Sequence, residues 1–320
     1  MLMPRFIVSI FSVGLMVVGA GVAYGQDYPK KPIRIIASPP GGATDFMARI
    51  TAQGLSGRLG QPVVVDNRPS ALTGEIAAKA PPDGYTLLST ATNFWTLPLV
   101  RKTSYDPVRD FSPITLVATS PNILVVHPSL PVRSVKELIA LAKARPGELN
   151  YMAAEAGSIQ QLGGELFNAM AGVKVVGIAY KSAGAGIISL LGGEVQVIFA
   201  ASPASVAPHM KAGTLRAIAV GSLQPSALFP GLPTVSASGL PGYESILIQG
   251  IFAPGRPPAA IITRLNQEIE LVLNQPDVKE RVLTIGAEVT PSSPEQLAAT
   301  MKSDMVKLGK VIKDAGIKGD

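Results

Sequence analysis

The sequence predicts an α/β protein, and three observations lead to this fold class. Short apolar runs alternate with stretches of helical periodicity along most of the 320 residues. The strand candidates are continuously apolar, as expected for sheets that helices cover on both faces. The 32 glycines and 28 prolines are spread without a period, which is typical of frequent turns between short elements. We therefore expect mostly parallel sheets flanked by helices.

The elements follow one another in order along the chain. Strands are expected at 33–37, 63–65, 85–89, 114–118, 123–126, 174–177, 195–199 and 215–220. Helices are expected at 44–59, 134–144, 159–170, 185–191 and 205–211, with three more after Pro257 and Pro258. Ser134 with Glu137, and Ser293 with Gln296, have the spacing of capping boxes and predict where two helices begin.

The composition excludes several other classes. Hydrophobic residues make up 47% of the chain and charged residues 16%, so the chain has enough apolar residues to bury a core and is not disordered. Only residues 6–23 form an apolar run long enough to cross a membrane, which excludes a protein with several spans. The net charge of +6 is diffuse, so we expect no nucleic acid partner.

The N-terminus predicts a signal peptide at residues 1–25. Arg5 supplies the positive charge, residues 6–18 the apolar run, and Ala23-Tyr24-Gly25 a cleavage site of small residues. An uncleaved membrane anchor is the alternative, although two glycines in the run weaken it as a spanning helix. The chain has no cysteine, and an exported protein without disulfides is most simply periplasmic.

Catalytic signatures are missing from the sequence. It contains no nucleophile elbow, zinc-binding helix motif, phosphate-binding loop or dinucleotide fingerprint. The two histidines, His127 and His209, have no carboxylates near them in sequence that would complete a metal site. We expect no enzyme, no cofactor and no metal.

Several loops between strands and helices are suited to holding an anion. The most suggestive runs from Pro39 to Asp45, because its glycines let the backbone approach a ligand and the following helix offers unpaired N–H groups. A plain turn with Thr44 or Asp45 as N-cap is the alternative interpretation. Residues 154–158 and 180–184 repeat this pattern, and residues 89–93 add hydroxyl groups at another strand end.

An ordered series of motifs resembles one family over almost the whole mature chain. The motifs are YPKKPIRII at 28–36, PPGGATD at 39–45, VVVDNRP at 63–69, PDGYTLL at 82–88, YDPVRDFSP at 105–113, AYK at 179–181, LLGG at 190–193, AGTLR at 212–216, GLPGY at 239–243 and AGI at 315–317. This series closely resembles Bug receptors, the periplasmic solute-binding proteins of tripartite tricarboxylate transporters.

The resemblance implies a fold and a function. It implies a two-lobed periplasmic binding protein of type II, with lobe 1 at 26–121 plus 222–320 and lobe 2 at 122–221. A small carboxylate would bind between the lobes, which close about a hinge, and a monomer would deliver it to membrane permease subunits. Two alternatives stay open, a sensor for a membrane signalling partner and an exported hydrolase.

The resemblance also implies which residues contact the ligand, and where this chain departs from its family. The implied ligand-binding residues are Pro40, Gly41, Gly42, Thr44, Asp45, Ser70, Thr73, Thr90, Thr92, Asn93, Gly157, Ser158, Gln161, Tyr180, Ser182, Ala183 and Ala200. Departures include a shortened stretch at 70–79, Gln161 for a frequent histidine, Ser182 for a glycine and Gln249 for a frequent tryptophan. Ala200 replaces a common acid, which predicts a ligand without a cationic end.

Overall fold

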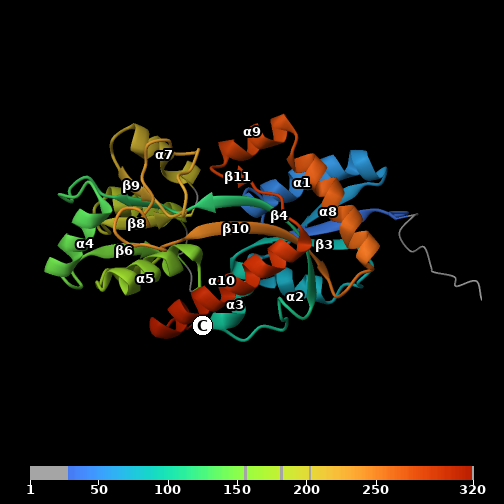
Figure 1. The fold of residues 1–320 in the computed structure, drawn as a ribbon, viewed down its shortest axis with the longest axis horizontal. Coiled ribbons are helices and arrows are strands. Elements are labelled where there is room, and N and C mark those ends of the chain that lie inside the picture. Colours follow the sequence, from blue (N-terminus) through green and yellow to red (C-terminus); the bar gives the residue numbers. More distant parts are fainter. Residues whose placement is uncertain (1–27, 155–156, 181–182, 202, 319–320) are drawn as a thin grey trace, which may run out of the picture.

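The structure is a computed structural model that describes residues 28–154, 157–180, 183–201 and 203–318. The predicted signal peptide and Ser182 lie outside these ranges. Within them, no helix is long and apolar enough to cross a membrane. The described chain forms two lobes that lie side by side along the long axis, and the long strands β4 (Phe111–Pro121) and β10 (Ile246–Pro254) run from the first lobe toward the second (Figure 1).

The first lobe is built on a six-stranded sheet in the order β11-β4-β10-β3-β1-β2 over the described residues. Its other strands are β1 (Ile33–Ala37), β2 (Val63–Asn67), β3 (Thr86–Ala91) and β11 (Glu288–Val289). Its helices are α1 (Ala43–Leu59), the 3-10 turn η1 (Ser70–Leu72), α2 (Thr73–Ala78), α3 (Asn93–Val100), α8 (Ala259–Leu273), α9 (Pro276–Thr284) and α10 (Pro294–Asp314).

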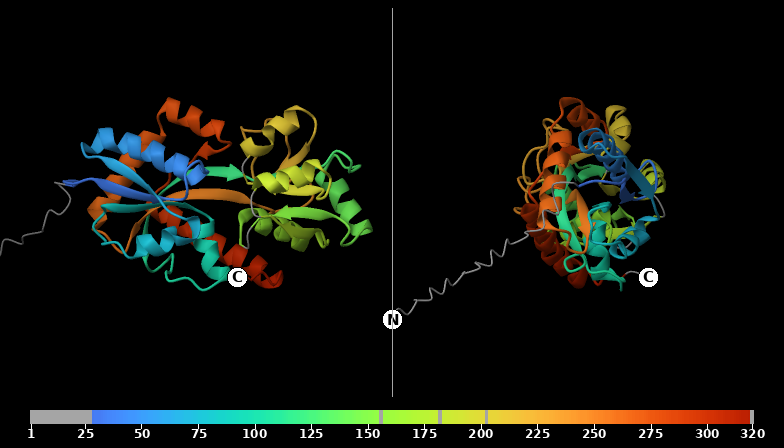
Figure 2. Two further views of the ribbon diagram at one scale, coloured as in Figure 1. Left: turned by 180° about the vertical axis from the view of Figure 1, so that it is seen from behind. Right: turned by 90° about the vertical axis from the view of Figure 1, so that its right-hand side faces the viewer.

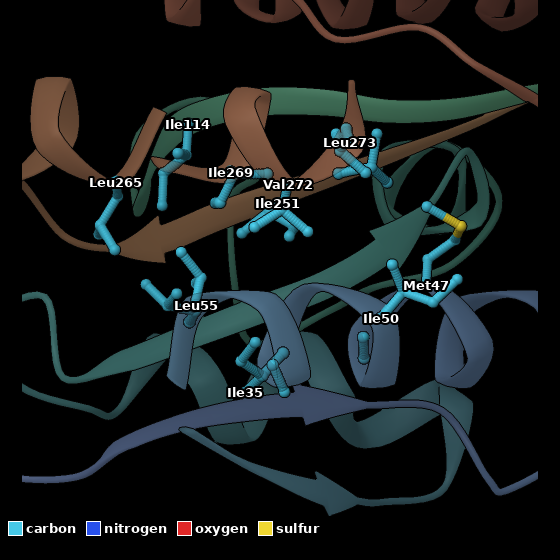
Figure 3. Close-up of a cluster of buried hydrophobic side chains, with 14 of the residues drawn as sticks. Ile35, Met47, Ile50, Leu55, Ile114, Ile251, Leu265, Ile269, Val272 and Leu273 are labelled. Atoms are coloured by element: carbon cyan, nitrogen blue, oxygen red, sulfur yellow. The ribbon is translucent and has the colours of Figure 1, made fainter. Parts of the chain in front are cut away.

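Helices cover both faces of this sheet, as its continuously apolar strands require. On one face, α1 and α8 pack over the sheet, and Figure 3 shows their side chains meeting there: Met47, Ile50 and Leu55 from α1 with Leu265, Ile269 and Val272 from α8. On the other face, side chains from α2, α3 and α10 surround Phe252 of β10. Alternate residues of β10 therefore point to opposite cores.

The second lobe has a five-stranded sheet in the order β7-β6-β8-β5-β9 among the described residues. Its strands are β5 (Ile123–Val126), β6 (Asn150–Ala153), β7 (Val176–Ala179), β8 (Val197–Ala200) and β9 (Arg216–Val220). Its helices are α4 (Val135–Ala144), α5 (Ile159–Ala171), α6 (Ala183–Leu191) and α7 (Pro203–Lys211). The C-terminal helix α10 also extends toward this lobe (Figure 2). Its Val311 packs into the core around β5 and α5.

Three backbone segments are bonded together where the chain passes between the lobes. The Gly221 N–H donates to the Asn122 carbonyl at 2.7 Å, and the Ser245 N–H donates to the Gly221 carbonyl at 2.8 Å. The Asn122 N–H donates to the Ser245 carbonyl at 3.0 Å, which closes the ring of bonds. The Asn122 side chain is buried there and donates to Ser245 Oγ at 2.7 Å. We call Asn122, Gly221 and Ser245 the crossing point.

The structure corrects two expectations about the lobes. The sheets are mixed, not mostly parallel: β1, β2 and β3 run parallel to one another, but β10 is antiparallel to both β3 and β4, and β5 is antiparallel to β8 and β9. The reason is that one strand beside the crossing point in each sheet, β10 in the first and β5 in the second, runs against the parallel strands of the βαβ units. The chain after 221 also stays with the second lobe, since Val235, Leu240 and Tyr243 belong to its core.

Several elements are present that the sequence did not predict. Strand β6 has four residues, α3 contains Pro98, and β10 is interrupted in sequence by Gln249 and Gly250. The capping box of α10 is confirmed, with both reciprocal bonds between Ser293 and Gln296. At α4, Ser134 accepts from the Glu137 N–H as predicted, but the Glu137 carboxylate accepts from the Arg133 N–H, one residue earlier.

Candidate functional site

The helix α1 begins in a backbone conformation that leaves its first turn open. Gly41 has a φ of +87°, a left-handed conformation that favours glycine, and the exposed Gly42 is the N-cap. No side chain of a described residue caps this helix, whereas Ser134, Ser158 and Ser293 cap α4, α5 and α10. The first N–H groups of α1 and the positive end of its dipole are therefore available to an anion.

Asp45 holds the loop before α1 in place. Its Oδ2 accepts from the Gly41 N–H at 3.0 Å and from Arg49 Nε at 3.1 Å, while Oδ1 accepts from Asn67 Nδ2 at 2.7 Å. Asn67 also donates to the Ser38 carbonyl, which ties the end of β2 to the end of β1. Burial raises the pKa of this carboxyl, but the bonds from Arg49, Asn67 and Gly41 outweigh burial and leave the pKa below its usual value.

The end of β3 lies beside this turn of α1. Ser89 Oγ donates to the Thr44 carbonyl at 3.2 Å, so Ser89 faces α1. Thr90 is the next residue along the strand and therefore faces the opposite core. The Thr92 hydroxyl accepts from the Ile248 N–H at 3.1 Å, and half-buried Asn93 is the first residue of α3. Of the predicted hydroxyls here, neither Thr90 nor Thr92 points to α1.

In the second lobe, the loop before α5 is bonded to itself. The Gly157 N–H donates to Gln161 Oε1 at 2.9 Å, and the Gln161 N–H donates to Ser158 Oγ at 3.3 Å. Gln161 thus occupies a backbone amide that the sequence suggested for a ligand. Unlike α1, α5 therefore begins with a side-chain cap, in which Ser158 takes up the N–H of Gln161.

The loops of the two lobes meet through α3. Thr96 Oγ1 donates to the Gly157 carbonyl at 3.3 Å, and Val100 lies against Gly157. Val100 also belongs to an apolar cluster that contains Ile159 and Leu162 of α5 and Leu308 and Ile312 of α10. The structure therefore brings together the loop at Gly157 and the first lobe.

The remaining predicted residues lie in different surroundings. Ser70 is exposed, and Thr73 is buried with its hydroxyl donating to the Ser70 carbonyl at 3.0 Å. The Tyr180 hydroxyl is bonded to Ser189 of α6, which in turn donates to Glu194. Ala200 is buried in the apolar cluster around Met152, and Ala183 is the first residue of α6.

Gln249 is a polar residue that the list of predicted contacts did not include. It lies in the middle of β10 with 1% of its surface exposed, and neither Nε2 nor Oε1 has a hydrogen-bond partner among the described residues. The sequence showed Gln249 only as a departure from the family pattern. Its burial could not be read from the sequence, because the run from Ile246 was not predicted as a strand.

A separate surface pocket lies at the other end of β3. Its lining includes Glu75, Lys79, Pro82, Arg109 and Asp110. Pro82 precedes β3, whereas the loops above follow the carboxyl ends of β1 and β3, where ligands of open α/β sheets bind. Among the described residues, no group of three histidines, aspartates or glutamates could hold a metal ion.

The comparisons with known proteins agree with this architecture. The sequence model described as the tripartite tricarboxylate transporter family receptor matches residues 47–317. The chain belongs to this family. The R. palustris protein Rpa4515, solved with adipate, is 33% identical with a TM-score of 0.78, and the match covers 92% of this chain and 100% of that one.

Two further solved structures lie close to this receptor. The periplasmic binding protein BugD is 30% identical with a TM-score of 0.73, covering 92% of this chain and 100% of its own. MatC from Rhodopseudomonas palustris, solved with bound malate, is 25% identical with a TM-score of 0.73, covering 89% and 100%. The family consists of solute-binding receptors of the periplasm, and the predictions of a Bug receptor, a two-lobed fold and a protein that is not an enzyme are confirmed.

Proposed function

We propose that this receptor binds a small dicarboxylate between its lobes, with one carboxylate at the N-terminus of α1. The uncapped first turn of α1 carries the proposal, because its N–H groups and dipole favour an anion. Asp45 lies beside this site but does not repel the anion strongly, since its charge is paired with Arg49. The adipate and malate in the related structures support a dicarboxylate as the ligand class.

The second lobe would complete the site by closing over the ligand. The first turn of α5, where Ser158 caps the N–H of Gln161 only, would offer a second set of N–H groups. Movement would centre on the crossing point, where Asn122, Gly221 and Ser245 are held by three backbone bonds. A ligand that contacts both lobes binds the closed state better and shifts the population toward it.

Isothermal titration calorimetry of the chain without residues 1–25 tests this function. Succinate, glutarate, adipate and malate are the probes, with the corresponding monoamides as controls for the second carboxylate. Saturable binding of at least one dicarboxylate, together with a smaller radius of gyration in small-angle X-ray scattering, supports the proposal. Binding of none of the probes, or saturation without compaction, contradicts it.

The cellular setting is part of the proposal. The chain would be exported by residues 1–25, cleaved after Gly25, act as a monomer in the periplasm and deliver its ligand to the permease subunits of a tripartite tricarboxylate transporter. N-terminal sequencing of the periplasmic fraction should begin at Gln26. Size-exclusion chromatography with light scattering should give the mass of one chain, and loss of uptake on deleting the permease subunits tests the partner.

A further inference from the structure

We infer that the amide of Gln249 contacts the ligand and selects a dicarboxylate that also carries a hydroxyl group. This inference rests on the proposed function, because it concerns the same site. Its starting observation is the buried side chain of Gln249, whose donor and acceptor both lack a partner among the described residues.

The register of the first sheet places Gln249 on the face that α1 covers. Gln249 is opposite Ala91 of β3, and two residues further Ile251 is opposite Ser89 with no shift between them. Ile251 packs in the core that α1 shares, and Ser89 bonds to Thr44 in the first turn of α1. Since side chains two residues apart share a face, Gln249 lies on the same face as Ile251 and Ser89.

The same register places Gln249 just beyond the start of α1. Ser89 is level with Thr44, and Ala91 is two residues closer to the carboxyl end of β3, roughly 6–7 Å further along. The neighbour of Gln249 on the other side is Ala118 of β4. Gln249 thus stands between two alanines in the sheet, whose side chains cannot bond to its amide, and the amide has no partner among the described residues.

An unpaired amide in this position is costly to the protein alone. Buried polar groups are normally bonded, and a glutamine that stays buried without partners loses its bonds to water without replacement. A ligand that bonds to both Nε2 and Oε1 would remove this cost, and an apolar side chain of similar size would remove it without the ligand.

The two atoms of the amide define the ligand class. Nε2 is a donor and matches a carboxylate oxygen, whereas Oε1 is an acceptor and needs an O–H or N–H group from the ligand. The residues next to Gln249 in the sheet on this face are Ala91, Ala118 and Ile251, and none of them has a charge to pair with an ammonium group. The donor on the ligand is therefore a hydroxyl, and the ligand is a hydroxydicarboxylate.

Calorimetry with three matched pairs tests the inference: succinate with malate, glutarate with 2-hydroxyglutarate, and adipate with 3-hydroxyadipate. The wild-type chain should bind the hydroxylated member of at least one pair about tenfold or more tightly, since a site built for a hydroxyl rejects ligands without it. In Gln249→Met this preference should disappear. Equal affinity within every pair, or a preference that persists in Gln249→Met, overturns the inference while the proposed function stands.

A thermal-unfolding measurement without ligand separates a ligand contact from a structural role. Gln249→Met should keep or raise the midpoint, because it removes an unpaired amide. Gln196→Met is the matched control: its amide bonds to Asn150, Gly193 and Glu194, so its midpoint should fall while the ligand preference is unchanged. A clear fall for Gln249→Met would show that the amide has a structural partner and would overturn the inference.

No binding of any probe by the wild type refutes the proposed function, and the inference with it.

Discussion

The indole Nε1 of Trp95 donates a hydrogen bond of 2.8 Å to Oδ2 of Asp304, which ties α3 to the C-terminal helix α10. Both residues are buried. Burial raises the pKa of the Asp304 carboxyl, and the nearby charge of Glu244 raises it further. The hydrogen bond from Trp95 and the charge of Lys307 act in the opposite direction, but burial outweighs them. Helix α3, whose Thr96 contacts the loop at Gly157, is thus held to α10 by a carboxyl group that is unfavourable to ionise.

We expect Asp304→Asn to become more favourable relative to the wild type as the pH rises. An acid whose folded pKa is raised stabilises the fold fully below its unfolded pKa, near 3.9, and loses that contribution as the pH rises through the folded value. Asparagine keeps an acceptor for Trp95 and has no proton to lose. Urea unfolding of both proteins from pH 4 to pH 8 measures the difference, and a constant difference would contradict the prediction.

Asp304→Ala serves as the control for the hydrogen bond. It leaves Trp95 Nε1 buried without an acceptor, which should cost about 1–3 kcal/mol of unfolding free energy at every pH in this range. If alanine and asparagine are equally stable at pH 7, the bond to Trp95 contributes nothing to stability.

Asp45→Ala should disorder the loop that precedes α1. The substitution removes the acceptor for Gly41, Arg49 and Asn67 at once, so we expect a loss of about 1–3 kcal/mol and weaker ligand binding. Because the pKa of Asp45 is lowered, its contribution is present above the unfolded value and is lost as the pH falls through the folded one. Unfolding curves at pH 3 and pH 7 should therefore differ less for Asp45→Ala than for the wild type.

Gly221→Ala should disrupt the crossing point. A Cβ on Gly221 would lie 2.6 Å from the Ser245 carbonyl oxygen and 3.1 Å from that of Asn122, and both are backbone atoms that cannot turn aside. We expect a loss of about 2 kcal/mol or more in denaturant unfolding. Gly57→Ala is the control, because a Cβ there meets nothing within 4 Å and alanine at this exposed position of α1 should stabilise the fold by about 0.5–1 kcal/mol. Equal effects of the two substitutions would argue against a close approach at Gly221.

The ligand is expected to lack a cationic end. Ala200 stands at a position where the family resemblance implies a frequent acid, and it lies in the same apolar cluster as Met152. Burying an ammonium group without a partner is unfavourable, so aspartate and glutamate should bind at least tenfold more weakly than succinate and glutarate. Calorimetric titration decides this, and tight binding of an amino acid with no binding of the plain dicarboxylates would refute it.

The sequence predicted the parts of the fold that depend on local chemistry. The cap of Ser293 and the strand Ile33–Ala37 are specified by neighbouring residues, and both are found in the structure. Strand β10 was missed because Gln249 and Gly250 interrupt its apolar run. Its identity depends on pairing with β3 and β4, which are distant in sequence.

The sequence predicted which loops form the candidate site, but not which of their backbone and side-chain groups are available to a ligand. The sequence located the loop at Gly41 and Gly42 because its glycines and the following helix are adjacent. It could not show that Asp45 and Gln161 occupy the amides of Gly41 and Gly157, since this depends on side-chain rotamers. Nor could it show that Gln249 has no hydrogen-bond partner in the part of the chain that the structure describes, which requires knowing both neighbouring strands.

The crossing point also has a consequence for the order in which the protein folds. Pro121 and Ile246, where the chain leaves and re-enters the first sheet, are directly paired, so the second lobe is an uninterrupted insertion in a β4–β10 hairpin. Apart from Val311 of α10, the core of that lobe comes from one continuous stretch of chain, so most of it can form before α10 is in place. The first lobe must wait for β10 and for α10, and a short turn in place of the insertion should leave it able to fold as a separate domain.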